Sequence, residues 1–121
     1  MTKDLMRVLL YDSIKIMNGR EVEIPLYSES NVEDVLNRTY TYNFETEFKI
    51  FEDIKVIFYM AGHIPGAARV YLISDEGSLF YSGDFSLFPQ IAVEGAKFPK
   101  LRPDVAIVES TYDDNIIEMK Y

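Results

Sequence analysis

Two polar residues follow apolar runs of this chain at glycine-containing turns, and both have side chains that can bind a metal or transfer a proton. His63 lies in the run AGHIPG and Asp84 in the run YSGDF. Gly62 and Gly66 allow the backbone beside His63 to turn tightly and to approach a neighbouring segment. Polar residues at strand ends are a common source of metal ligands and catalytic groups. The pattern therefore indicates a candidate site that contains His63 and Asp84.

Both residues also have an ordinary structural interpretation. A single histidine after a strand is often a hydrogen-bonded residue of the fold. A Gly-Asp pair is a common turn, whose carboxylate accepts backbone N–H groups. Residue type and spacing alone leave both interpretations open.

Composition limits the chemistry that this chain can support. It has no cysteine and one histidine, so a bound metal must be held by imidazole and carboxylate. Twenty acidic residues against twelve basic ones give a net charge of −8, which repels phosphate backbones and argues against sequence-independent nucleic-acid binding by this chain alone. The scattered basic residues are interpreted as solubilising: Arg7, Lys15, Lys97, Lys100 and Arg102.

The apolar residues indicate one small soluble domain. The chain has 121 residues, of which 48% are hydrophobic. No apolar run reaches the roughly 18 residues of a membrane span, and the charged N-terminal stretch does not resemble a secretory leader. We expect a cytoplasmic protein that does not contact a membrane.

Two helices are expected in the first third of the chain. The spacing of apolar residues after Thr2 predicts a helix that Thr2 caps and that Gly19 ends in a left-handed conformation. Ser30 and Glu33 have the spacing of a capping box, which predicts a second helix from Asn31 to Arg38.

The rest of the chain is typical of strands. Five runs are rich in β-branched and aromatic residues: EFKIF, IKVIFYMA, ARVYLIS, SLFYSG and VAIVES. Glu52-Asp53 and Asp75-Glu76-Gly77 are short enough to close hairpins, so most of the sheet is expected to be antiparallel. The apolar run VAIV predicts a buried strand. We expect a mainly helical part in residues 1–43, a mainly strand part in 44–112 and a tail in 113–121 that is disordered or helical.

Three segments together resemble the β-CASP branch of the metallo-β-lactamase superfamily: AGHIPGAARVYLI, LFYSGDFS and LRPDVAIVESTY. That branch includes RNA 3′-end-processing endonucleases and related archaeal and bacterial ribonucleases. The N-terminal segments KDLMRVLLYDSIKI and SNVEDVLNRT are similar to the family's segment before the Ala-Gly-His strand. The resemblance implies an α/β (α+β) fold over residues 1–121, forming part of an αββα sandwich with two helices and a mostly antiparallel sheet.

The resemblance also implies roles for three residues. His63 would be a terminal ligand of one zinc ion and Asp84 the carboxylate that bridges two, which makes both residues catalytic. Zinc accepts imidazole and carboxylate ligands, and a pair of ions about 3.5–4 Å apart can share the hydroxide that attacks a phosphodiester. Glu109 would lie near the metals without binding them, in a supporting role.

The chain departs from the family in the number of its ligands. Family members bind most of their metal through an upstream His-x-His-x-Asp-His cluster, which a chain with one histidine cannot contain. The family's last ligand histidine and its RNA-clamping insertion should follow the Glu-Ser-Thr-Tyr run. We therefore expect an internal piece of a larger enzyme, which is inactive alone, binds zinc weakly and meets RNA only in a completed enzyme.

Two kinds of function remain open. The first is an enzyme piece whose other ligands lie on another segment, whether the gene is split or the sequence has been shortened. The alternative is a non-catalytic interaction or assembly module, or a degenerate remnant of the family. An incomplete sandwich should expose apolar sheet surface and an unpaired edge, so we expect a homo-oligomer or a partner chain that completes it. In either case His63 and Asp84 should converge from adjacent strand ends at one edge of the sheet.

Overall fold

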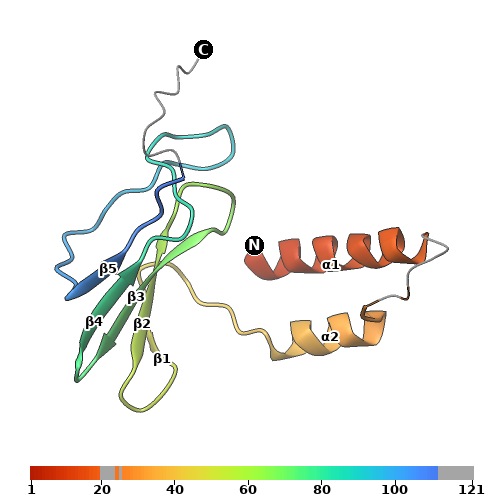
Figure 1. Ribbon diagram of the computed structural model, residues 1–121, viewed down its shortest axis with the longest axis horizontal. Coiled ribbons are helices and arrows are strands. Elements are labelled where there is room, and N and C mark those ends of the chain that lie inside the picture. The colour runs from red at the N-terminus through yellow and green to blue at the C-terminus, as the bar shows by residue number, and fades with distance from the viewer. Residues whose placement is uncertain (20–23, 25, 112–121) are drawn as a thin grey trace. The chain divides into compact units, whose positions relative to one another are not determined.

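The computed structural model describes residues 1–19, 24 and 26–111, and its helices and sheet give the α+β fold expected from the sequence (Figure 1). The chain divides into two compact units, Met1–Asn43 and Phe44–Tyr121, called here the helical unit and the strand unit. The grouping of both units into one partial domain stays a prediction. The expected tail lies outside the described residues. In the described part of the chain, no helix is long and apolar enough to cross a membrane.

The helical unit contains α1 (Thr2–Asn18) and α2 (Glu29–Arg38). Ile14 of α1 packs with Val32 and Leu36 of α2, and all three are buried. Partly buried side chains surround these three: Met6, Leu10, Tyr11, Met17 and Tyr27. Several residues that give α1 its apolar pattern are exposed instead: Leu5, Val8, Leu9 and Ile16. Only one strip of α1 therefore contributes to this small core.

The predicted ends of α1 are wrong in detail. The N-cap position is Met1 and no side chain caps it, so Thr2 lies inside the helix rather than before it. Gly19 occupies the C-cap with a φ of −81°, which is right-handed, and its N–H donates to Lys15 O. Because the last turn closes with ordinary helical geometry, no left-handed residue is needed there.

The start of α2 also differs from the prediction. Ser28, rather than Ser30, is the N-cap: its Oγ accepts from Asn31 N at 3.4 Å, and Asn31 Oδ1 accepts from Ser28 N at 2.9 Å. This reciprocal pair is a capping box two residues earlier than expected. Glu33 does not cap the helix, because its carboxylate binds side chains of α1.

The Glu33 carboxylate links the two helices. Tyr11 Oη donates to Glu33 Oε1 at 2.6 Å, and Arg7 Nη1 donates to the same oxygen at 2.8 Å. The Tyr11 hydroxyl and the Arg7 charge lower the pKa of Glu33 below its ordinary value. The same hydrogen bond raises the pKa of Tyr11.

We expect the helical unit to lose stability in acid through Glu33. Because the folded-state pKa of Glu33 is lowered from its ordinary value of 4.5, its stabilising effect is present above that pH and is lost as pH falls through the folded pKa. Thermal unfolding followed by helical circular dichroism between pH 3 and 7 measures this loss. The Glu33→Gln variant should show a weaker pH dependence, whereas Glu76→Gln in the strand unit should match the wild type. Equal acid sensitivity in all three proteins would show that protonation of Glu33 does not cause the loss of stability in acid.

The strand unit is a five-stranded sheet in the order β1-β2-β3-β4-β5. Neighbouring strands are antiparallel except for β4 and β5, which are parallel. The strands are β1 (Glu47–Lys49), β2 (Lys55–Met60), β3 (Ala68–Ser74), β4 (Gly77–Tyr81) and β5 (Val105–Ile107). All five predicted strands are therefore present, and the expectation of a mostly antiparallel sheet is confirmed.

Both predicted hairpins are present. Glu52 and Asp53 lie in the turn between β1 and β2, and Asp75 and Glu76 lie in the turn between β3 and β4. Gly77, the first residue of β4, has a φ of +146°, a value that favours glycine. The two turns lie at the same end of the sheet (Figure 1).

The prediction that the VAIV run is buried is wrong. Val105 and Ile107 of β5 are 56% and 50% exposed, and Val108 is 55% exposed. Among the strands of the described residues, β5 is the last in the sheet and pairs only with β4, so its side chains have a described strand neighbour on one side only. An apolar run indicates a strand whose side chains are suited to burial, but it does not show which segment would bury them.

The pairing of β5 is fixed by a reciprocal contact at its start. Asp104 Oδ2 accepts from both the N–H and the hydroxyl of Ser78 at 2.7 Å, and Asp104 N donates to Ser78 Oγ at 3.1 Å. These bonds lower the pKa of the Asp104 carboxyl, the Ser78 hydroxyl having the largest effect. The contact holds the register in which Leu79 pairs with Val105.

Candidate functional site

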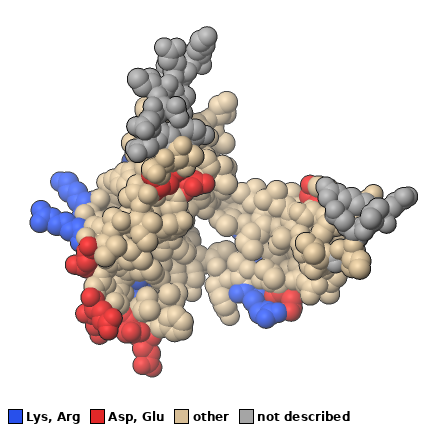
Figure 2. All heavy atoms as spheres, viewed as in Figure 1, with Lys and Arg blue, Asp and Glu red and all other residues tan. Residues whose placement is uncertain are grey.

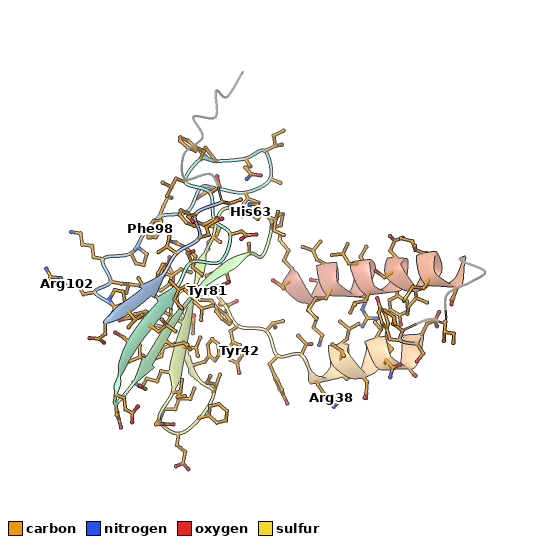
Figure 3. The ribbon with its side chains drawn as sticks, viewed as in Figure 1. Arg38, Tyr42, His63, Tyr81, Phe98 and Arg102 are labelled. Carbon is orange, nitrogen blue, oxygen red and sulfur yellow. The ribbon has the colours of Figure 1, made fainter. Side chains whose placement is uncertain are left out.

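Three strands end at the same edge of the sheet, opposite to the two hairpin turns. β2 and β4 are both antiparallel to β3, and β5 is parallel to β4, so all three run in one direction. His63 follows the end of β2, Asp84 follows the end of β4, and Glu109 follows the end of β5. Figure 3 shows His63 at this end of the strand unit. The topology therefore brings the three loops that carry the candidate residues to one edge.

The shared edge agrees with the prediction, but the strands are not adjacent, because β3 lies between β2 and β4. The loops are nevertheless joined: Ser86 N, shortly after Asp84, donates to Ala61 O, shortly before His63, at 3.0 Å. Both candidate side chains are exposed. Convergence of their side chains stays a prediction.

Gly62 is the point where three segments of this edge meet. Its φ is +72°, and a Cβ added to it would lie 2.5 Å from both Ala96 N and Ser86 O. Those two atoms are themselves hydrogen-bonded at 2.7 Å. Gly66, further along the same turn, has a φ of +84°. The tight turn and the close approach predicted for Gly62 are confirmed.

Glu109 connects the loop after β5 with the loop that carries Asp84. Its Oε1 accepts from Phe85 N at 2.7 Å, and its Oε2 accepts from the Thr111 hydroxyl at 2.6 Å. The Thr111 hydroxyl has the largest effect in lowering the pKa of Glu109, followed by the Phe85 amide, and the electrostatic interaction with His63 lowers it further. Glu109 is therefore held as an anion within electrostatic range of His63.

Ser82 is part of the same connection, although its sequence position alone did not indicate a role. It is fully buried, and its Oγ accepts from Glu109 N at 3.0 Å and donates to Gly83 O at 2.8 Å. Its N–H donates to Ile107 O at 3.0 Å. The sequence feature that could have indicated this role is a small hydroxyl residue between a strand and the Gly-Asp pair.

Arg69 is a second residue that sequence reasoning missed. It is 1% exposed, and its Nε donates to Met60 O at 3.1 Å while Nη2 donates to Lys97 O at 2.9 Å. Its guanidinium carbon lies 4.4 Å from the centroid of the Phe98 ring, which Figure 3 labels. A single cation inside the apolar run ARVYLIS was the signal in the sequence.

Acidic side chains gather at the opposite end of the sheet. Glu52, Asp53 and Asp75 lie together around the two hairpin turns, where Figure 2 shows a concentration of acidic atoms on the strand unit. Lys49 and Lys55 lie in the same group, so charges of both signs surround the turns.

The donors at this edge suit zinc in type but not in number. Neutral imidazole and carboxylate are common zinc ligands, and His63 and Asp84 supply one of each. In residues 1–19, 24 and 26–111, no three His, Cys, Asp or Glu side chains are grouped closely enough to hold a metal ion. These residues by themselves therefore do not form a complete metal site.

The chain is similar in sequence to much longer RNA-processing and transcription proteins. It is 37% identical over 120 residues to cleavage and polyadenylation specificity factor 73 of Drosophila melanogaster, covering 98% of this chain and 17% of that protein. It is 36% identical over 117 residues to transcription termination factor FttA of Pyrococcus abyssi, covering 92% of this chain and 17% of that protein. Endoribonuclease YSH1 of Yarrowia lipolytica is 33% identical over 112 residues, covering 92% of this chain and 13% of that protein.

The matched region is nearly the whole of this chain but only a small part of each relative. The match covers 17% of the Drosophila protein, 17% of the Pyrococcus protein and 13% of the Yarrowia protein, so this chain spans less than a fifth of the length of each. No family model matches the chain.

Proposed function

This chain is a relative, over nearly its whole length, of one segment of the β-CASP metallo-β-lactamase RNA nucleases, and on this premise we propose that it is part of a phosphodiester hydrolase acting on RNA. The meeting of three strand ends at one edge of the sheet supports the proposal. The loops that carry His63 and Asp84 are joined there by the hydrogen bond from Ser86 N to Ala61 O. The similarity to endoribonuclease YSH1 of Yarrowia lipolytica supports RNA as the substrate.

His63 and Asp84 are proposed as ligands of a zinc pair. His63 would hold zinc through its imidazole as a terminal ligand, and Asp84 would hold it through its carboxylate, in the role that the resemblance gives to a bridging ligand. When bound, zinc supplies a hydroxide at neutral pH and neutralises the charge that develops on phosphate. Glu109 supports the site without binding metal, because its carboxylate accepts from the Phe85 amide and so fixes the backbone directly after Asp84.

The ligand count leads us to propose that these 121 residues are inactive alone. They contain one histidine and no cysteine, whereas a catalytic zinc normally has three protein ligands and a water. A two-metal site needs more ligands than one imidazole and one carboxylate can provide. The remaining ligands come from another segment, on the same polypeptide or on a partner in the cytoplasm.

A non-catalytic assembly role is the second candidate, and the exposed side of β5 favours it. Tyr81 pairs with Ile107, so both side chains lie on the same face of the sheet, and they are 49% and 50% exposed. Leu79 and Val105 form the next pair on that face. An apolar face of this kind is suited to burial by a partner chain or a second copy.

Complementation of RNA cleavage distinguishes the two functions. The chain is incubated with zinc and labelled single-stranded RNA, alone and with a polypeptide that carries a His-x-His-x-Asp-His cluster, and complex formation is followed by light scattering. We expect no cleavage by the chain alone and metal-dependent cleavage by the complex, which a chelator abolishes. Cleavage by the chain alone would show that it is self-sufficient. A stable complex without cleavage would favour the assembly role.

A further inference from the structure

The segment of residues 85–103, which directly follows Asp84, differs in charge from the chain as a whole. It contains one acidic residue and three basic ones: Glu94, Lys97, Lys100 and Arg102. Three positive charges against one negative charge leave a net charge of +2, in a chain whose net charge is −8. Because β5 is parallel to β4, the segment runs back along the sheet from the edge after β4 to the start of β5. A polyanion that approaches the candidate site therefore meets an excess of positive charge along this segment.

Two cations of the 85–103 segment are exposed and without an acidic partner. Lys100 and Arg102 form no ion pair with any residue in the described part of the chain. Asp104, which follows them, directs its carboxylate to Ser78 instead. Figure 3 labels Arg102 at the side of the strand unit, and Figure 2 shows basic atoms at the same place. These two side chains are therefore available to contact phosphate groups.

Phe88, near the start of the segment, presents an aromatic ring to solvent on a fixed backbone. Its side chain is 61% exposed. Phe88 N donates to Ser86 Oγ at 3.3 Å, and the same hydroxyl donates to Phe88 O at 3.1 Å. A Cβ added to Gly95 would lie 2.2 Å from Leu87 O, so the returning part of the loop packs against the backbone beside Phe88. The ring is therefore both exposed and held in place by its own loop.

The loop that carries Phe88 is fixed to the loop that carries His63. Ser86 N donates to Ala61 O at 3.0 Å, and Ser86 O accepts from Ala96 N at 2.7 Å. Phe88 is thus two residues from a direct contact with the end of β2, and His63 is two residues beyond that contact. A ligand that rests on the Phe88 ring would therefore lie close to the edge of the candidate site.

We propose that the 85–103 segment binds single-stranded RNA, with a base stacked on the Phe88 ring and phosphates further along the strand contacted by Lys100 and Arg102. Exposed aromatic rings combined with basic side chains bind single strands with little base preference. Burial against an apolar protein surface would account for the exposed Phe88 but not for the positive charge that follows it. The inference rests on the proposed function, since it assigns the same RNA substrate a path to the edge that carries His63.

Binding of RNA without cleavage tests the proposal. The full 121-residue chain is titrated into fluorescently labelled oligouridylate of about twelve nucleotides, with a chelator present, and fluorescence anisotropy is followed at several salt concentrations. We expect weak binding at low salt. The logarithm of the association constant should fall against the logarithm of the salt concentration with a slope of about −1.4, since each of two phosphate contacts contributes about −0.7. No binding at low salt would overturn the proposal, as would binding that salt does not weaken.

The Phe88→Ser variant tests the stacking site. Loss of the ring should weaken RNA binding about fivefold or more and leave the salt slope unchanged. Phe51→Ser is the matched control, because Phe51 is 67% exposed in the turn between β1 and β2 at the other end of the sheet. Both positions are exposed, so both variants should keep the circular dichroism spectrum of the wild type. Equal RNA affinities of the two variants would overturn the assignment of the base to Phe88.

The Lys100→Gln variant tests the phosphate contacts. Removal of one contact should reduce the steepness of the salt dependence by about 0.7. Lys49→Gln removes the same charge from an exposed lysine at the end of β1, beside the hairpin turns, and should leave the salt slope unchanged. An equal effect of both variants would show that the overall charge of the chain, rather than the 85–103 segment, governs binding, and would overturn the proposal.

The RNA-binding segment and the proposed function fail separately. RNA binding that depends on Phe88, without cleavage by the completed assembly, would reject the proposed function and keep the RNA-binding segment. Binding and cleavage that Phe88→Ser leaves unchanged would reject the segment and keep the function. Loss of the complex with the cluster-bearing polypeptide in Phe88→Ser, with RNA binding unchanged, would assign Phe88 to a protein contact and overturn the inference.

Discussion

The Gly62→Ala variant is expected to lower the free energy of unfolding of the strand unit by about 3 kcal/mol. Gly62 has a φ of +72°, a conformation that costs an L-residue free energy, and a Cβ there would lie 2.5 Å from Ala96 N and Ser86 O. Both neighbours are backbone atoms, so neither can move aside by a change of rotamer. The variant should therefore separate the loops that bring His63 and Asp84 to one edge.

Chemical denaturation followed by tyrosine fluorescence measures this effect, since the chain has nine tyrosines and no tryptophan. Gly83→Ala is the matched control in the same unit: Gly83 has a φ of +52°, but its Cβ would meet nothing closer than Ala68 O at 3.5 Å. That variant should lose only about 1 kcal/mol, the cost of the left-handed backbone. Equal losses in both variants would show that the close approach at Gly62 contributes nothing.

The sequence predicted the strands well because each strand is defined locally. Runs of β-branched and aromatic residues separated by short polar turns identified all five, and the Gly77 turn has the positive φ that was expected. The α2 helix ends at Arg38 as predicted. Its start was misplaced because Ser28 and Ser30 both stand near the boundary, and only the contacts of Glu33 with α1 show that Glu33 does not cap the helix.

Burial was harder to predict than secondary structure. The VAIV run has the composition of a central strand, yet β5 is the outermost strand in the order β1 to β5, and its valine and isoleucine side chains are half exposed. Strand order depends on pairings between distant segments, and β5 reaches β4 only after a connection from Ser82 to Asp104. A local sequence pattern therefore does not predict the order of the strands.

The candidate site was predictable to the extent that it depends on strand ends. His63 and Asp84 were found because each follows an apolar strand at a glycine, and the resemblance of their segments to the nuclease family agrees with the curated relatives. The contacts that organise the edge were not predictable. Glu109 N binds Ser82 Oγ and Arg69 binds Lys97 O across 27 and 28 positions of sequence, so no short motif connects them.

The largest functional effects are expected at the two proposed ligands. Removing one ligand of a metal leaves a coordination position to water and weakens binding, so His63→Ala and Asp84→Asn should each lower the zinc affinity of the completed assembly by about 100-fold or more. Asp84→Asn should also abolish cleavage, because a neutral amide cannot bridge two cations as a carboxylate does. Glu76→Gln, which removes a carboxylate charge at the opposite end of the sheet, should leave both properties unchanged.

The central claim is that His63 and Asp84 bind metal in a site that this chain shares with another segment. Zinc affinity, measured by competition with a chelator, tests it most directly, for the chain alone and for its complex with a polypeptide that carries the His-x-His-x-Asp-His cluster. We expect weak binding by the chain alone, tight binding by the complex, and loss of most of that gain in His63→Ala and Asp84→Asn. Tight binding that both variants retain would contradict the claim.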